Sequence, residues 1–153
     1  MKRPTVMGID PGIKGAIAVI GDEVTEFWLL KEIVEQKTKH FDDIIRAYGI
    51  DHCFLEKAQA MPGQGVSTTF NYGVGFGRII GWLEILAVPF TLVPPQTWQK
   101  MMHLGCSGEP KDRSRQAVTR LFPRENLVPN GCVKLHDGLA DALLLAEYGR
   151  RQL

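Results

Sequence analysis

Three short apolar segments open the chain and are separated by residues that favour turns. Residues 5–10 and 15–20 flank Pro11 and Gly12, and residues 24–30 follow a second, polar turn. Apolar segments on either side of a turn that contains proline and glycine are typical of a β-hairpin. The chain is therefore expected to begin with three antiparallel strands, which limits the folds open to the rest of it.

The remainder of the chain alternates between strand-like and helical patterns. Apolar residues recur at helical spacing from Phe41 to Tyr48, and Gly49 follows where a helix would end. Other segments extend the alternation, with strands expected at 52–55 and 89–93 and helices at about 67–87, 110–121 and 136–150. This order predicts an α/β fold with a five-stranded mixed sheet flanked by helices. In such a sheet the first and fourth strands can lie side by side and parallel.

Four carboxylates occupy positions where acidic residues need a specific partner. Asp10 ends the first apolar strand, Glu56 ends the strand at 52–55, and Asp137 and Asp141 stand one turn apart at the start of the last helix. Acids near a core require protons, basic partners or a divalent metal. Oxygen ligands without a His or Cys cluster favour a hard cation, Mg²⁺ first and Mn²⁺ second.

Each acid alone also has a simpler structural explanation. Asp10 can form an Asx turn with the Pro11-Gly12 pair that follows it. Asp137 is a favourable residue for the first turn of a helix, and Asp141 could be a solvated surface charge. The four acids taken together favour metal-assisted phosphoryl chemistry on a polyanion.

Composition narrows the class of protein. The 153 residues suit one domain, with 44% hydrophobic and 23% charged residues. The net charge of +1 argues against a general nucleic-acid coat, yet residues 100–124 hold six Lys or Arg against Glu109 and Asp112. A basic stretch beside an acidic, metal-ready site is typical of a nuclease, which must bind phosphate in order to cut it.

The cysteines and the N-terminal residues indicate in which cellular compartment the protein is expected. Three widely spaced cysteines without a CxxC pair indicate neither a zinc site nor a disulfide framework, and they favour a reduced, intracellular setting. The N-terminus reaches Asp10 before a signal peptide could form, and no apolar run approaches the ~18 residues of a membrane span. We therefore expect a soluble protein with no membrane partner and no organic cofactor.

Five motifs occur in order along nearly the whole chain: MGIDPGIKGAIAVI, LEKAQAMPGQGVSTTFNYGVGFGRIIGWLE, VPPQTWQKMM, SGEPKDRSRQAVTRLFP and HDGLADALLLAEYG. Together they resemble the RuvC-type Holliday junction resolvases. The MPGQG loop and the i, i+4 spacing of the final acids are similar to the phage and chloroplast-type members. In the bacterial enzymes the corresponding acids are spaced i, i+3, so His136 is a possible substitute for Asp137 as a ligand.

The resemblance implies an RNase H-like nuclease domain spanning 1–153, which acts as a homodimer and makes paired nicks across four-way DNA junctions. It implies two Mg²⁺ ions per active site, replaceable by Mn²⁺, held by Asp10, Glu56, Asp137 and Asp141. In two-metal hydrolysis one ion activates water and the other stabilises the leaving 3′ oxygen. The expected activity is that of a Mg²⁺-dependent crossover junction endodeoxyribonuclease.

The resemblance also implies residues that contact DNA. Lys100 and Lys111 resemble phosphate-contacting lysines, with Arg113 and Arg115 as helpers, although each could equally be a solvated surface charge. The loop and helix after Glu56 supply candidates for insertion at the junction centre, namely Met61, Gln64 and Phe70. Phe70 could instead lie in the core or at a dimer interface, and Gly73 to Gly81 could form a close-packed dimer surface.

Other functions remain open at this stage. The first motif is also similar to the phosphate loop of actin-like and sugar-kinase ATPases, but 153 residues leave no room for the second domain that those enzymes need. A RuvC-like nuclease acting on RNA would use the same metal chemistry. A junction-binding protein that has lost cleavage would keep the fold, although the presence of all four acids argues against it.

Overall fold

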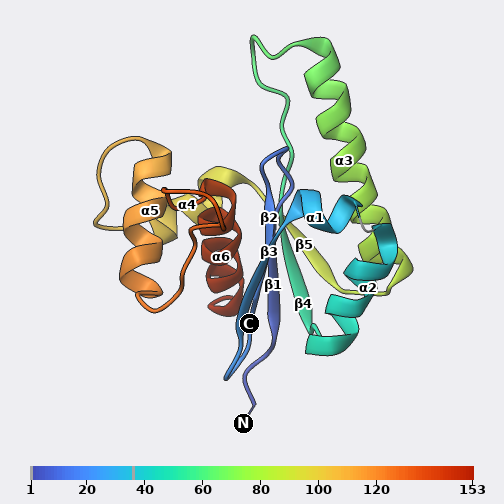
Figure 1. The fold of residues 1–153 in the computed structure, drawn as a ribbon, viewed down its shortest axis with the longest axis horizontal. Coiled ribbons are helices and arrows are strands. Elements are labelled where there is room, and N and C mark those ends of the chain that lie inside the picture. Colours follow the sequence, from blue (N-terminus) through green and yellow to red (C-terminus); the bar gives the residue numbers. More distant parts are fainter. Residues whose placement is uncertain (1, 36) are drawn as a thin grey trace.

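Five strands form one mixed sheet in the computed structural model, which describes residues 2–35 and 37–153 (Figure 1). The strands are β1 (Val6–Asp10), β2 (Ala16–Ile20), β3 (Thr25–Leu29), β4 (His52–Glu56) and β5 (Phe90–Val93), in the spatial order β3-β2-β1-β4-β5. β1 to β3 pair antiparallel, whereas β4 lies parallel to both β1 and β5. The predicted mixed sheet, with its first and fourth strands adjacent and parallel, is confirmed.

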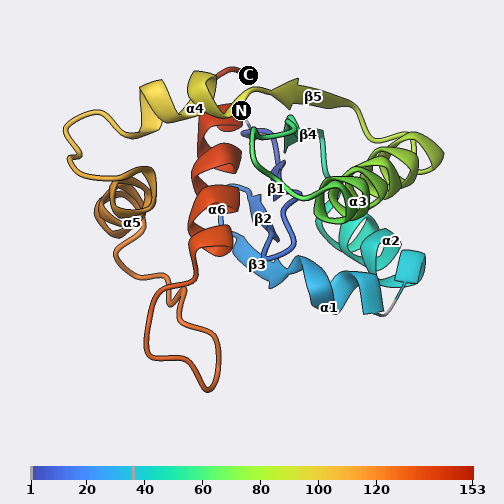
Figure 2. The same cartoon turned by 90° about the horizontal axis from the view of Figure 1, so that it is seen from above.

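Helices cover both faces of the sheet (Figures 1 and 2). One face carries α1 (Leu30–Glu35), α2 (Lys37–Tyr48) and α3 (Val66–Ile85), and the other carries α4 (Pro95–Met102), α5 (Pro110–Leu121) and α6 (Asp137–Arg150). In the described ranges, no helix is both long enough and apolar enough to cross a membrane.

The sequence prediction omitted α1 and α4. α1 follows β3 directly and has only six residues, too few to produce a helical periodicity. α4 begins at Pro95, where the missing N–H of proline is tolerated, and it is eight residues long. The consecutive prolines at positions 94 and 95 mark the start of this helix.

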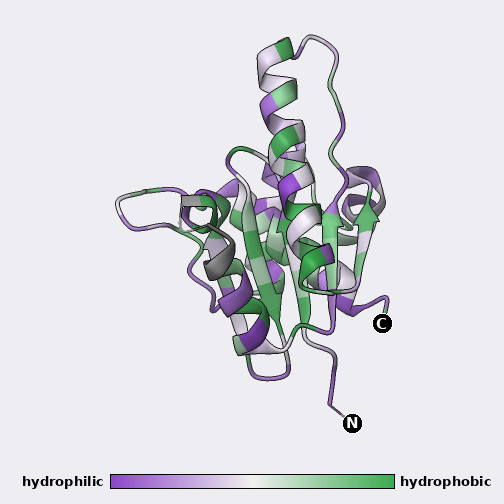
Figure 3. Cartoon of the chain, turned by 90° about the vertical axis from the view of Figure 1, so that its right-hand side faces the viewer, coloured by the Kyte–Doolittle hydropathy of each residue, from purple (hydrophilic) through white to green (hydrophobic). Residues whose placement is uncertain are grey.

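Side-chain alternation places the buried apolar residues of β1, β2 and β4 alternately in one of two cores. Met7 and Ile9 of β1 pack in the core beneath α2 and α3. Val6 of β1 and Phe54 of β4 belong to the opposite core, which α6 completes. Figure 3 shows the resulting hydrophobic strands between more polar outer surfaces. Because Asp10 and Glu56 follow the same alternation, both lie on the α6 side of the sheet.

Glycine allows α6 to approach β1 closely. A Cβ at Gly8 would overlap the backbone carbonyl of Ala142 and would lie 2.5 Å from the backbone nitrogen of Ala146. A Cβ at Gly138 would overlap the carbonyl oxygen of Lys14 in the same way. Backbone atoms cannot move aside as a flexible side chain can, so these two glycines set the distance between helix and sheet.

Gly8→Ala is expected to lower the free energy of unfolding by about 2–3 kcal/mol, because overpacking of a rigid interior costs this much. Gly77→Ala in α3 is the matched control, since an added Cβ there meets nothing within 4 Å. The control should raise stability by about 0.5–1 kcal/mol, as alanine is the better helix former. Urea unfolding measures both changes, and equal effects of the two variants would contradict the close-approach explanation.

Candidate active site

Asp10 and Glu56 stand next to each other at the ends of two parallel strands. The register pairs Ile9 of β1 with Leu55 of β4, so the next residue on each strand is a carboxylate. Oδ1 of Asp10 accepts a hydrogen bond of 2.9 Å from the Gly12 backbone N–H. The predicted Asx-type turn is therefore present, and it coexists with the pairing of the two acids.

Asp141 of α6 completes a group of three carboxylates. Its Oδ1 atom is buried and has no hydrogen-bond partner among the residues that the structure describes. The hydroxyl of Ser114, on α5, lies beside the carboxylate and lowers its pKa. An unpaired carboxylate oxygen inside a protein is costly, and a bound cation is one way to satisfy it.

Burial and mutual repulsion raise the pKa of all three acids to about 7. For Asp10 burial is the larger cause and the charge of Glu56 the second, opposed by the Gly12 hydrogen bond. For Glu56 burial is again first, and a hydrogen bond from Trp98 partly offsets it before Asp141 adds to the rise. For Asp141 burial exceeds the effects of its neighbours, among which Asp10 raises its pKa. Each acid thus raises the proton affinity of another, as expected for carboxylates that share one site.

Asp137 occupies a different environment from Asp141, although both are on α6. Its Oδ1 lies 2.7 Å from Nη2 of Arg115, and its Oδ2 lies 3.5 Å from Nζ of Lys111. Its side chain is 30% exposed. The fourth predicted ligand is therefore held by two cations at the edge of the site.

His136 precedes Asp137 and caps α6. Its Nδ1 accepts a hydrogen bond of 3.3 Å from the Leu139 backbone N–H. Burial lowers the pKa of His136, and nearby Lys31 and Lys14 lower it further against the opposing charge of Asp137. Because Nδ1 accepts the Leu139 hydrogen bond, a neutral ring carries its hydrogen on Nε2, so His136 would have to give up the cap or that hydrogen to bind a metal. Its role as a substitute ligand stays a prediction.

A cleft of about 600 Å³ opens beside these residues. Asp10, Asp137 and Asp141 contribute acidic groups to its lining, and Lys14 and Lys111 contribute basic ones. Acidic and basic groups in one cleft suit a phosphate that must be drawn towards bound cations.

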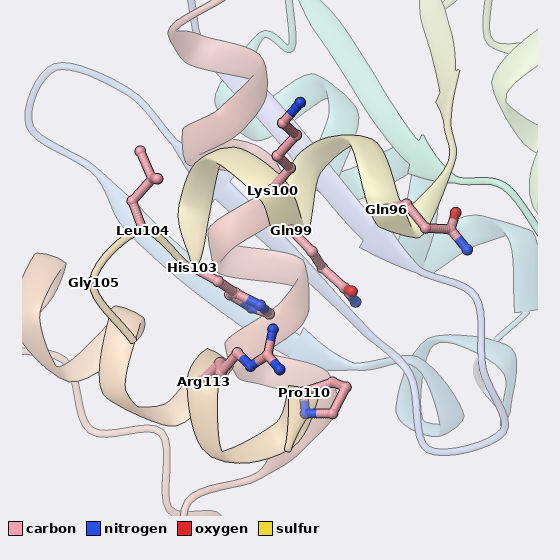
Figure 4. Close-up of a pocket in the computed structure, with 8 residues that line it drawn as sticks. All are labelled: Gln96, Gln99, Lys100, His103, Leu104, Gly105, Pro110 and Arg113. Carbon is pink, nitrogen blue, oxygen red and sulfur yellow. The ribbon is translucent and has the colours of Figure 1, made fainter. Parts of the chain in front are cut away.

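The other predicted DNA-contacting residues lie outside this cleft. Lys100 and Arg113 line a separate pocket of about 400 Å³ between α4 and α5, together with Gln99 and His103 (Figure 4). Figure 4 shows the side chains of Gln99, His103 and Arg113 converging, whereas Lys100 points away from them.

The loop after β4 and the start of α3 carry the remaining candidates. Met61 is 63% exposed and Phe70 is 70% exposed. The side-chain oxygen of Gln64 accepts a hydrogen bond of 3.3 Å from the Met61 backbone N–H, which stabilises the turn between them. The structure thus leaves both apolar side chains accessible to a partner.

Sequence reasoning missed three residues that face the carboxylates. Trp98 donates from Nε1 to Oε2 of Glu56 over 2.7 Å, and Ser114 lies beside Asp141. Burial raises the pKa of Tyr72, on α3, to about 12, and the charges of Asp10 and Glu56 add to the rise. The Tyr72 hydroxyl is therefore close enough to both carboxylates to be affected by their charge. The only sequence signal was their position inside helical motifs, and α4, which carries Trp98, was not predicted at all.

The site fits a hard divalent cation. Within residues 2–35 and 37–153, no three Asp, Glu, His or Cys side chains are already close enough to form a finished metal cluster. Three carboxylates with raised pKa values and one unpartnered oxygen nevertheless supply the oxygen donors that Mg²⁺ and Mn²⁺ prefer. A cation would replace protons as the partner of these charges and draw the carboxylates together.

Comparison with known proteins identifies the fold. No protein-family model matches the chain, and the search of curated proteins found no match. Among solved structures, Thermus thermophilus RuvC in complex with a Holliday junction substrate matches with a TM-score of 0.69 at 18% identity, covering 97% of this chain and 96% of that one. Yeast mitochondrial Holliday junction resolvase Ydc2 matches with a TM-score of 0.57 at 13% identity, covering 97% and 79%.

The fowlpox virus resolvase, solved with Holliday junction DNA, matches with a TM-score of 0.55 at 18% identity, over 97% of both chains. The chain therefore has the fold of the RuvC-type resolvases, and the predicted RNase H-like α/β architecture is confirmed. Structural matches at 13–18% identity establish only the fold, so the reaction must be argued from the residues of the site.

The carboxylate group makes stability depend on pH in a defined direction. Acids whose pKa is raised in the folded state stabilise the fold fully below their unfolded pKa near 4, and this contribution is lost as the pH rises towards 7. Asp10→Asn removes one charge from the group. We expect it to raise the free energy of unfolding by about 2 kcal/mol at pH 8, with the gain largely gone at pH 4.

Urea unfolding without divalent metal, at several pH values, measures this dependence. Asp43→Asn is the control, because Asp43 is an exposed acid on α2. Its effect should be small at every pH. A gain for Asp10→Asn that did not change with pH would show that charge repulsion is not the cause.

Proposed function

We propose that the chain is a Holliday junction resolvase, a metal-dependent endonuclease that makes paired symmetric nicks across four-way DNA junctions. The observation that carries the proposal is the meeting of Asp10, Glu56 and Asp141 in one site. The fold is shared with two resolvases solved in complex with junction DNA. Fold alone does not define function, so the residues of the site carry the argument.

Asp10, Glu56 and Asp141 are proposed to hold two Mg²⁺ ions, for which Mn²⁺ can substitute, with Asp137 as the fourth ligand. When bound, such ions activate water for in-line attack and stabilise the leaving 3′ oxygen. Asp10 is proposed as the ligand that the two ions would share, because it ends the central strand β1 and lines the cleft together with Asp137 and Asp141.

The basic residues have a second task at this site. Arg115 and Lys111 now neutralise Asp137, and a phosphate arriving in the cleft competes for the same two cations. Transfer of Arg115 and Lys111 to phosphate would release Asp137 to act as a ligand. Phosphate binding would then add Asp137 to the three inner carboxylates that hold metal, and Lys100 and Arg113 would hold the backbone farther along.

The upper part of α3 supports a homodimer. α3 projects beyond the sheet, and Val66, Phe70 and Val74 follow one another at intervals of four residues along it (Figures 1 and 3). All three are exposed, so they form an apolar stripe that the described chain does not cover. A two-fold dimer suits a four-way junction, because it presents two sites to two opposed strands.

Asp10→Asn is expected to abolish cleavage of a synthetic four-way junction, because the shared ligand loses its charge. Binding of the same junction should stay within about three-fold of wild type, since phosphate contacts supply most of the affinity. Cleavage with Mg²⁺, with Mn²⁺ and with EDTA is measured by gel, and binding by fluorescence anisotropy. Asp43→Asn serves as the control with normal cleavage.

The substrate panel of matched duplex, RNA hairpin and four-way junction separates the remaining possibilities. Preference for RNA hairpins would move the assignment to a RuvC-like RNA nuclease. Tight junction binding by the wild type with no cleavage in either metal would identify a junction-binding protein. Normal nicking by Asp10→Asn would show that the carboxylate group is not the active site.

Val74→Asp is expected to convert the dimer into monomers, because it places a charge within the apolar stripe. Ile85→Asp is the matched control, since Ile85 is an exposed apolar residue at the other end of α3, away from the apolar stripe. Sedimentation velocity measures the assembly state, and junction nicking should change from paired cuts to single cuts in the monomer. A wild-type chain that sediments as a monomer would rule out this interface.

A further inference from the structure

Trp98 restrains the carboxylate of Glu56 by a hydrogen bond from within the core. The indole is fully buried, and its Nε1–H donates a 2.7 Å hydrogen bond to Oε2 of Glu56. Indole has a single donor and no acceptor, so this bond fixes which way the carboxylate faces. Only one oxygen of Glu56 is engaged by it, and Oε1 is available to a cation.

Asp141 is held by a chain of two polar side chains. Ser114 of α5 is 2% exposed and lies beside the Asp141 carboxylate, and Nε2 of His103 lies 2.9 Å from the Ser114 hydroxyl oxygen. The Ser114 hydroxyl has one hydrogen and the ionised Asp141 carboxylate has none, so in that state Ser114 can only donate to Asp141. Nε2 of His103 must then carry a hydrogen and donate to Ser114. The direction of the chain is therefore His103 to Ser114 to Asp141.

The hydrogen-bond donors to Glu56 and to Ser114 both come from α4 or the residue that caps it. Trp98 lies on α4 and His103 directly follows it, and their rings pack edge to face with centroids 5.5 Å apart. Figure 4 shows the His103 ring at the pocket between α4 and α5, with the Arg113 side chain pointing towards it. Burial and the charge of Arg113 lower the pKa of His103, which keeps the ring neutral with a single N–H.

A nucleophilic triad is an alternative use of Ser114, His103 and Asp141, and the geometry excludes it. In a triad the histidine lies between the serine and the acid, so that it can take the serine proton. Here the serine lies between the histidine and the acid, and it is almost completely buried. The hydroxyl cannot reach a substrate.

We propose that Trp98, Ser114 and His103 are positioning residues that fix Glu56 and Asp141 for binding of a divalent cation. The proposal rests on the proposed function, because it assumes that these carboxylates are metal ligands. Hydrogen bonds behind metal ligands restrict their rotation, and their loss typically weakens metal binding about 10- to 100-fold. α4 thereby links the two acids, directly at Glu56 and through Ser114 at Asp141.

Calorimetric titration of the DNA-free protein with Mn²⁺ tests the role of Trp98. Trp98→Phe keeps a buried aromatic ring and removes only the N–H donor. We expect Mn²⁺ to bind about 10-fold more weakly to this variant. Trp82→Phe is the matched control, because Trp82 is also buried but packs against Phe41 on the opposite face of the sheet. The control should bind Mn²⁺ as the wild type does.

A second series tests the chain to Asp141. Ser114→Ala and His103→Leu should each weaken Mn²⁺ binding about 10-fold, and the double variant should be no weaker, because both changes break one chain. His103→Gln retains an N–H donor and should bind Mn²⁺ within about two-fold of wild type. A merely structural role for His103 would make Gln and Leu equally harmful.

The possible results distinguish failure of the metal site from failure of the positioning role. Absence of Mn²⁺ binding to the wild type would overturn the metal site, and the positioning role with it. Wild-type binding together with equal affinities for Trp98→Phe and Trp82→Phe would overturn the positioning role alone. Circular dichroism and urea unfolding report whether each variant folds, and if Trp98→Phe does not fold, the Ser114 and His103 series decides.

Discussion

The close packing of α6 on β1 and β2 is the contact on which the rest of the structure depends. Gly8 lets the backbone of the helix approach the backbone of the strand, and Gly138 does the same where α6 begins. The same approach brings Asp141 to the end of β1, beside Asp10. Interior packing and the assembly of the site are therefore consequences of one interface, and a change that loosens the interface loosens the site.

The site combines groups that oppose folding with groups that restrain them. Three carboxylates with raised pKa values destabilise the metal-free protein near neutral pH, as stored strain at functional sites often does. Trp98 and Ser114 lower this cost by donating hydrogen bonds, while Arg115 and Lys111 neutralise Asp137. Glu56 and Asp141 thus receive hydrogen bonds from neutral side chains that cannot leave the core. Asp137 instead pairs with two basic side chains that can exchange it for a phosphate.

Sequence patterns predicted the sheet and most helices because these features are local or follow from strand order. Asp10 and Glu56 could be paired in advance, since parallel neighbours end at the same edge of a sheet. Asp141 could be added from helical spacing, but the same spacing could not distinguish it from Asp137. The two acids differ because Arg115 and Lys111, on α5, pair with Asp137. This is a tertiary contact, which the spacing of acids along one helix cannot reveal. Trp98 and Ser114 were missed for a related reason, because a buried indole or hydroxyl is indistinguishable from core until its partner is known.

The three inner carboxylates also come from distant points of the chain, at positions 10, 56 and 141. A growing polypeptide that has reached β5 already contains Asp10 and Glu56, yet it lacks α6 and the third acid. Cutting activity of the proposed kind therefore cannot arise in a nascent or partly folded chain. The order of synthesis thus delays assembly of the three-carboxylate site until α6 has been made.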